Sequence, residues 1–156
     1  MSPESISVIE QRRIEAEIIK PIYEILCREL GEDKAKAILR EAVSQSARAT
    51  GHALASSDKN GGGLAGFVQL QELWSRGGAL KTRVLASDAR EYHYQVTYCR
   101  YAEMYQQLGL SGIGDILSCQ RDAAFIEGYA PEVSLTRSST IMEGGACCDF
   151  LYQVKD

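Results

Sequence analysis

The segment Thr136–Phe150, TRSSTIMEGGACCDF, constrains the fold most, because two short strand-like runs meet there at a Gly-Gly pair. Glycine accepts the positive φ angles of two-residue hairpin turns, so the pattern predicts a β-hairpin centred on Gly144–Gly145. This register places Arg137 opposite Tyr152. Each face of the predicted hairpin mixes apolar and reactive side chains, which favours the wall of a pocket over a purely structural element.

The remaining elements follow from the spacing of apolar residues. A helical period predicts three helices before any strand, at 6–30, 33–56 and 64–76, with a bend in the first at Pro21. A period of two then predicts a hairpin of two strands, 80–87 and 91–99. Two more helices, at 98–108 and 112–127, lead to the final hairpin. The run SSDKNGGG at 56–63 predicts a loop.

Together these elements predict an α+β fold. N-terminal helices precede a four-stranded antiparallel sheet of two hairpins, with two helices inserted between the hairpins and the helices packed on one side. Alternation along the second strand places Tyr92, Tyr94 and Val96 on one face and His93 and Gln95 on the other. A length of 156 residues without an internal repeat or linker predicts one domain, 1–156.

Composition excludes several classes of function. The net charge of −4 and the scattering of basic residues among acids argue against a nucleic-acid partner. No run of about 18 apolar residues is present, so no membrane span is expected. Charges occupy the N-terminus where a signal peptide needs an apolar stretch, which predicts a cytoplasmic location. The amphipathic helix at 6–30 offers a surface for a homo-oligomer.

Five cysteines without a CxxC motif predict free thiols rather than disulfides. Cys99 lies at a strand-to-helix switch, where the helix N-terminus and Arg100 are expected to lower its pKa. Cys119 precedes Asp122 by three residues and therefore shares a helical face with it. Cys148 adjoins Asp149 on a strand. A buried thiol that acts only as a small apolar group is the alternative for each.

Charged residues near these thiols suggest what a ligand would look like. Arg137, Arg121 and Arg100 are candidates to bind a carboxylate, since guanidinium binds that group bidentately. The acidic candidates to hold a cationic amidine or to move protons are Asp122, Glu143 and Asp149. The alternative for each of these residues is a solvated surface charge.

Three blocks of the C-terminal half carry a resemblance to a known family: YQVTYCRYAEMYQQLGL, GDILSCQRDAAFIEGYAP and LTRSSTIMEGGACCDFLY. In this order they resemble the L-2-amino-thiazoline-4-carboxylic acid hydrolase family over roughly residues 94–152, with a weaker match through the N-terminal helices. The resemblance implies a hydrolase that opens a cyclic isothiourea, a small molecule with amidine and carboxylate groups, towards N-carbamoyl-L-cysteine.

Chemical reasoning assigns hypothetical roles to residues within these blocks. A cysteine would attack the amidine carbon, with Cys148 favoured over Cys99 and Cys119. Asp122 or Asp149 would orient the amidine, and Glu143 would protonate the leaving group. The predicted substrate-binding residues are Arg137, Arg100 and Tyr94. A divalent metal held by the three cysteines, either delivering hydroxide or acting structurally, is the alternative role for these thiols.

A second function class stays open from the sequence. The order of elements, with a Gly-rich turn and cysteines near the C-terminus, is weakly similar to the vinyl-reductase-like small-molecule-binding domains. The resemblance implies a pocket that binds a small hydrophobic molecule without catalysis. Pocket polarity discriminates the two, because inward acids and arginines favour a zwitterionic substrate.

Overall fold

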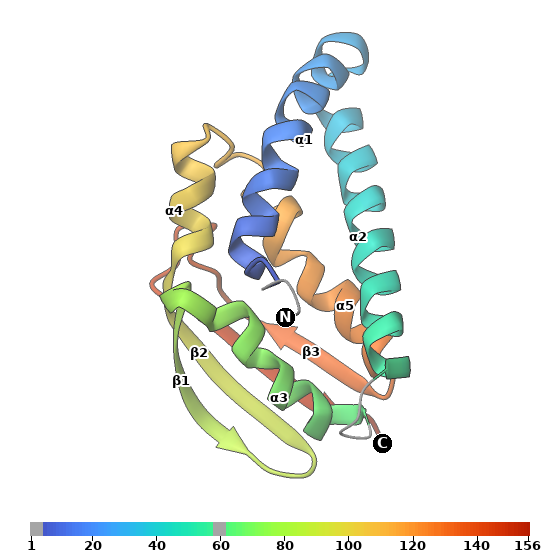
Figure 1. Ribbon diagram of the computed structural model, residues 1–156, viewed down its shortest axis with the longest axis vertical. Coiled ribbons are helices and arrows are strands. Elements are labelled where there is room, and N and C mark those ends of the chain that lie inside the picture. The colour runs from blue at the N-terminus through green and yellow to red at the C-terminus, as the bar shows by residue number, and fades with distance from the viewer. Residues whose placement is uncertain (1–4, 58–61) are drawn as a thin grey trace.

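The computed structural model describes residues 5–57 and 62–156, and its first two helices form a long antiparallel pair (Figure 1). Helix α1, Val8–Leu30, begins at Ser7, whose hydroxyl accepts a hydrogen bond from the Glu10 amide at 3.3 Å. It continues through Pro21 and ends at Gly31, where φ is +87°. Helix α2, Glu32–Ser57, then runs back along α1. Of the predicted loop at 56–63, residues 58–61 lie outside the described part of the chain.

Three shorter helices follow: α3, Gly63–Ser75; α4, Arg100–Gln107; and α5, Arg121–Tyr129. The single helix predicted at 112–127 was wrong, because a π-helical turn, Asp115–Cys119, precedes α5. The Gln120 amide bonds back to the carbonyl of Asp115 at 2.8 Å, which widens the helix locally. Single π turns of this kind are frequent at functional sites.

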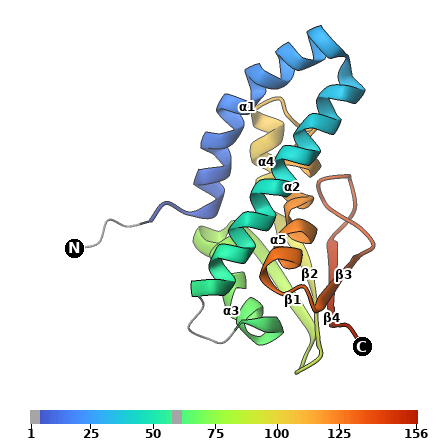
Figure 2. The same cartoon turned by 90° about the vertical axis from the view of Figure 1, so that its right-hand side faces the viewer.

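The four strands form one antiparallel sheet in the order β1-β2-β4-β3, which confirms the predicted α+β fold. The strands are β1, Leu80–Ser87; β2, Glu91–Cys99; β3, Val133–Arg137; and β4, Cys148–Val154. The central strands pair Tyr94 with Phe150 and Tyr92 with Tyr152. Their buried side chains meet Phe67 of α3, so helices cover one face of the sheet (Figure 2).

The tight turn predicted for the second hairpin was wrong. Arg137 pairs with Phe150 rather than Tyr152, and a connection of ten residues, 138–147, joins β3 to β4. Thr140 accepts a hydrogen bond from the Glu143 amide at 3.2 Å and donates one to the Glu143 carboxylate at 3.0 Å. These local bonds fold the chain into a turn, and that turn replaces the further strand pairing that the register required.

Two apolar clusters form the core. One lies between the sheet and helices α3 and α5, and the other lies among α1, α2, α4 and the π-helical turn. The outer side of α1 exposes four isoleucines, Ile14, Ile18, Ile22 and Ile25, between 47% and 64%. The homo-oligomer expected from this helix stays a prediction. In the described part of the chain, every helix is too short or too polar to cross a membrane.

Two glycines allow α2 and α5 to pack at close range. A Cβ added to Gly128 would lie 2.1 Å from the carbonyl oxygen of Arg48, and one added to Gly51 would lie 2.3 Å from that of Phe125. Both obstacles are backbone atoms, which cannot rotate away as side chains do. The position of α5 over the sheet therefore depends on these two small residues.

We expect Gly128→Ala to lower the free energy of unfolding by about 3 kcal/mol or more, because the methyl group forces the two helices apart. Chemical denaturation measures this change. Gly112→Ala is the matched control, since a Cβ there meets no atom within 4 Å. A Gly128→Ala variant as stable as the control would contradict the close packing of α2 and α5.

Candidate active site

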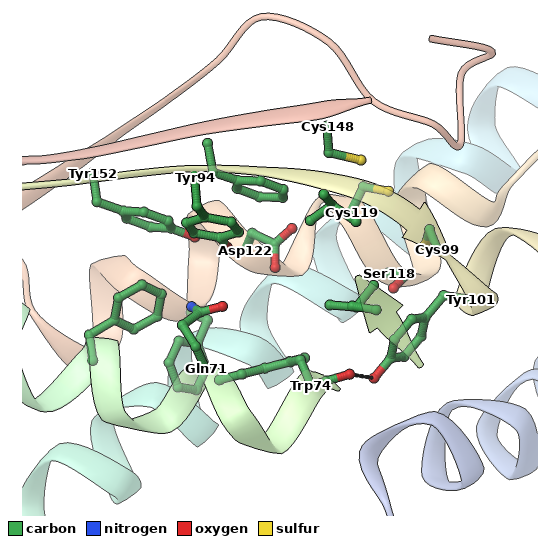
Figure 3. A pocket seen from close by; sticks show the side chains of 15 residues that line it. Gln71, Trp74, Tyr94, Cys99, Tyr101, Ser118, Cys119, Asp122, Cys148 and Tyr152 are labelled. Atoms are coloured by element: carbon green, nitrogen blue, oxygen red, sulfur yellow. Dashed lines mark hydrogen bonds between the residues drawn. The ribbon is translucent and has the colours of Figure 1, made fainter. Parts of the chain in front are cut away.

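A cavity lies between the buried face of the sheet and helices α3 and α5 (Figure 3). Its wall is mostly aromatic and aliphatic, with one carboxyl group and three thiols among the polar groups. The thiols of Cys119 and Cys148 lie towards one end and Tyr152 towards the other, with Asp122 between them. The lining residues are Phe67, Gln71, Trp74, Leu80, Tyr94, Val96, Cys99, Tyr101, Ser118, Cys119, Asp122, Phe125, Cys148, Phe150 and Tyr152.

Asp122 is the only carboxyl group among these lining residues, and Arg137 holds it in place. Nη1 of Arg137 donates to Asp122 Oδ2 at 3.1 Å and to the carbonyl oxygen of Cys119 at 2.7 Å. The Asp122 side chain keeps 28% of its surface accessible, and it lines the cavity wall. Burial raises the pKa of Asp122 to about 6, although the positive charges of Arg137, Arg12 and Arg121 limit the rise.

Three predicted thiols meet at the cavity, but none is activated by its surroundings. Burial raises the pKa of Cys148 to about 11, against the opposing effect of the hydrogen bond from the Ile141 amide to its sulfur at 3.2 Å. Burial likewise raises the pKa of Cys119 well above its ordinary value. The prediction of a lowered pKa for Cys99 was wrong, because loss of solvent outweighs the amides of Tyr101 and Ala102 at the helix start.

Four of the predicted site residues lie away from this cavity. Asp149 points from the opposite face of β4 and accepts hydrogen bonds from Gln95, at 3.2 Å, and from His93, at 3.1 Å. Glu143 lies in the connection between β3 and β4 and binds Thr140. Arg100 lines a separate surface groove, and Arg121 lies on the other side of α5.

The structure brings together the predicted residues Tyr94, Cys99, Cys119, Asp122 and Cys148. Arg137 supports this group from behind Asp122, through the contacts described above. Sequence reasoning missed Gln71, Trp74 and Ser118, which complete the wall. Alternation along the strand placed Phe150 and Tyr152 on one face. The helical spacing of Trp74 is the same in a cavity wall as in any apolar core, so it could not identify Trp74 as a cavity residue.

The family model for L-2-amino-thiazoline-4-carboxylic acid hydrolase matches residues 11–152. The chain belongs to this family. The matched residues include every residue that lines the cavity.

A search of the curated proteins found no match. Among solved structures, the chain is similar to the phenol-responsive sensory domain of the transcription activator PoxR, whose crystal structure was determined with phenol. The two share 11% sequence identity, with a TM-score of 0.56 over 88% of this chain and 73% of that chain. This similarity establishes a shared fold.

The arrangement of the side chains bears on the alternative of a metal held by the cysteines. Across residues 5–57 and 62–156, no group of three or more His, Cys, Asp or Glu side chains is arranged to hold a metal ion. Cys99, Cys119 and Cys148 line one cavity without converging on a common point. The residues described here therefore do not fit the three-thiolate site that the sequence left open.

We expect Asp122 to make stability depend on pH. Because its pKa is raised to about 6, the folded protein keeps this proton at pH values at which the unfolded chain has lost it. The contribution of Asp122 to the free energy of unfolding therefore falls as pH rises from about 4 to about 6. Relative to the wild type, Asp122→Asn gains up to about 3 kcal/mol over this interval.

Asp149→Asn is the matched comparison, measured by denaturant titration across the same pH range. Partial burial raises the pKa of Asp149, but hydrogen bonds from His93 and Gln95 outweigh it and leave the pKa below its ordinary value. The Asp149→Asn variant should therefore lose stability relative to the wild type as pH rises. Curves for Asp122→Asn that run parallel to the wild type would contradict the raised pKa.

Proposed function

We propose that this cavity is the active site of a hydrolase that opens a cyclic isothiourea ring. The substrate class is that of L-2-amino-thiazoline-4-carboxylate, and the product is N-carbamoyl-L-cysteine. The family match supports the reaction, and one observation supports the site. Asp122, a carboxyl group with a pKa of about 6, lines a cavity with a largely aromatic wall.

The aromatic wall suits a flat cationic ring. Tyr94 and Phe150 stack with ring centroids 4.9 Å apart and an interplanar angle of 7°, and Phe150 is parallel to Tyr152 within 4°. These rings offer a planar surface to an amidinium, whose positive charge is attracted to aromatic faces. A ring bound there would lie beside Asp122.

Proton transfer is assigned to Asp122. Its ionised carboxylate accepts a proton from a water molecule while the water oxygen bonds to the amidine carbon of the ring. The bond from that carbon to the ring sulfur then breaks, and the sulfur takes the proton from Asp122 as it becomes the thiol of the product. The added hydroxyl becomes the carbonyl of the carbamoyl group and releases its proton to solvent, which also removes the positive charge that the ring carried. One water is added in total, and Asp122 returns to its ionised form.

The raised thiol pKa values favour water over a cysteine as the nucleophile, since a neutral thiol attacks slowly. Cys148, which the sequence favoured for attack, lies in the same cavity and remains the alternative nucleophile. Arg137 is assigned to positioning Asp122 rather than to the substrate carboxylate, because its Nη1 already binds Asp122 and Cys119.

Turnover of L-2-amino-thiazoline-4-carboxylate by the purified protein tests the proposal. We expect Asp122→Asn to lower kcat/KM by about 100-fold or more, the usual contribution of a general base. Cys148→Ala, Cys119→Ala and Cys99→Ala should retain most of the activity. Loss of activity in a folded Cys148→Ala variant would instead make Cys148 the nucleophile, and loss on addition of a chelator would make a metal part of the site.

The same assay has an expected pH dependence. Because Asp122 acts in its ionised form and its pKa is about 6, kcat/KM should rise with pH and level off above about 7. Asp149→Asn, which changes a carboxylate on the outer face of the sheet, should leave this profile unchanged. A profile that does not rise through pH 6 would remove Asp122 from proton transfer.

A second candidate function is the binding of a small aromatic molecule without catalysis. The specific observation that favours it is the largely apolar cavity wall in a fold shared with a phenol-responsive sensory domain. Calorimetric titration with phenol distinguishes the two. Phenol binding together with no turnover of the thiazoline would support the binding function and overturn the hydrolase.

A further inference from the structure

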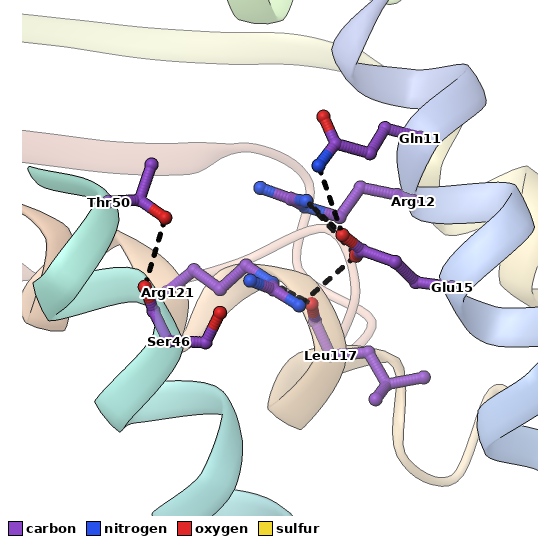
Figure 4. A network of polar contacts seen from close by, with 7 residues as sticks. All are labelled: Gln11, Arg12, Glu15, Ser46, Thr50, Leu117 and Arg121. Carbon is purple, nitrogen blue, oxygen red and sulfur yellow. Dashed lines mark hydrogen bonds and ion pairs between the residues drawn. The ribbon is translucent and has the colours of Figure 1, made fainter. Parts of the chain in front are cut away.

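A second cavity lies on the other side of α5, enclosed by α1, α2 and the end of α3. It shares three residues with the first cavity, Trp74, Asp122 and Phe125, so these residues lie between the two cavities. Its polar residues come from three helices that are distant in the sequence (Figure 4). They include Arg12 and Arg121, the two cationic groups of its wall.

Both arginines are largely withdrawn from solvent, with side chains 14% and 13% exposed. Arg12 donates to both carboxylate oxygens of Glu15, at 3.1 and 3.2 Å, and Arg121 donates to the same carboxylate at 3.2 Å. Asp122 forms its salt bridge with Arg137, at 3.1 Å, and acts on Arg12 and Arg121 only through the longer-range attraction of its charge. Two buried guanidinium groups therefore share one carboxylate.

In the described part of the chain, this arrangement leaves several N–H donors of the two arginines without an acceptor, and one positive charge without a paired carboxylate. A guanidinium carries five N–H donors. Within the described residues, Nε and Nη2 of Arg12 and Nη1 of Arg121 make no hydrogen bond. Among the described residues, no fully buried side-chain nitrogen or oxygen lacks a partner, so these free donors reach accessible space, and both arginines line the second cavity. A carboxylate that enters the cavity can accept from them, because it matches the forked geometry of guanidinium.

We infer that Arg12 and Arg121 form the site that binds the carboxylate of the substrate. The carboxylate would lie in the second cavity, and the cationic ring would reach past Trp74 to Asp122. This inference deepens the proposed function and rests on it for the identity of the substrate. The arrangement also explains how the protein selects a zwitterion, since opposite charges meet the two ends of one molecule.

A probe without an amidine carbon tests carboxylate binding apart from hydrolysis. L-thiazolidine-4-carboxylate keeps the sulfur- and nitrogen-containing ring and the carboxylate, while thiazolidine lacks the carboxylate. Titration calorimetry of the wild type should show binding of the first and at least 10-fold weaker binding of the second. Equal affinity for the two molecules, or no binding of L-thiazolidine-4-carboxylate, would overturn the inference.

Variants separate a binding role from a purely structural link between α1 and α5. We expect Arg12→Gln and Arg121→Gln each to weaken binding of L-thiazolidine-4-carboxylate about 10-fold or more. Glu15→Gln should strengthen binding several-fold, because it removes the carboxylate that competes for both arginines. Arg48→Gln, which changes an exposed arginine paired with Glu127, is the control and should bind as the wild type does.

Arg121 also donates to the Leu117 carbonyl at 2.7 Å, so its variant tests folding as well as binding. Arg12 bonds only to Glu15 among the described residues, and its variant therefore decides the outcome if Arg121→Gln does not fold. Unchanged affinity in a folded Arg12→Gln variant, or weaker binding in Glu15→Gln, would overturn the inference. Binding that follows these expectations without any turnover of the thiazoline would support this site and overturn the hydrolase.

Discussion

The ion pair between Asp122 and Arg137 is the interaction on which the candidate site depends. It joins α5 to the last residue of β3, and it fixes the only carboxyl group of the cavity wall between the aromatic and thiol ends. Burial pulls the Asp122 pKa upwards and Arg137 pulls it downwards, so the group titrates near neutrality. The proton transfer proposed for Asp122 needs this balance, because an effective acid or base has a pKa near the working pH.

Helix packing delivers Asp122 to this position. The glycines at the contact between α2 and α5 let the two backbones approach closely, and α5 then lies over the inner face of the sheet. The π-helical turn before α5 places Ser118 and Cys119 in the same cavity wall as Asp122.

The two cavities on the two sides of α5 differ in electrostatic character. The first is lined by aromatic rings and neutral thiols, and the second contains two arginines that share a single carboxylate. Asp122 faces both. A hydrophobic ligand would need only the first cavity, whereas a zwitterionic ring would use the two together, so the hydrolase and binding hypotheses differ in what they require of Arg12 and Arg121.

Local patterns in the sequence predicted much of the fold. The strands at 80–87 and 91–99 had the predicted bounds, because alternation of apolar residues identifies a half-buried strand without tertiary information. Cys119 and Asp122 line one cavity wall, as their three-residue spacing on a helix predicted. The second hairpin failed where side chains bonded to nearby backbone, since Thr140 and Glu143 form a turn that strand periodicity does not report.

The sequence by itself determined the element order, the α+β class, the family and which side chains share a face of each central strand, since all of these depend on neighbours along the chain. Only the tertiary structure decided the electrostatics. Burial, not the adjacent helix end, sets the pKa of Cys99, and Arg137 pairs with Asp122 across 15 positions of sequence. Arg12 and Arg121 meet from positions 109 residues apart, because solvent exclusion and charge pairing depend on what surrounds a group in space.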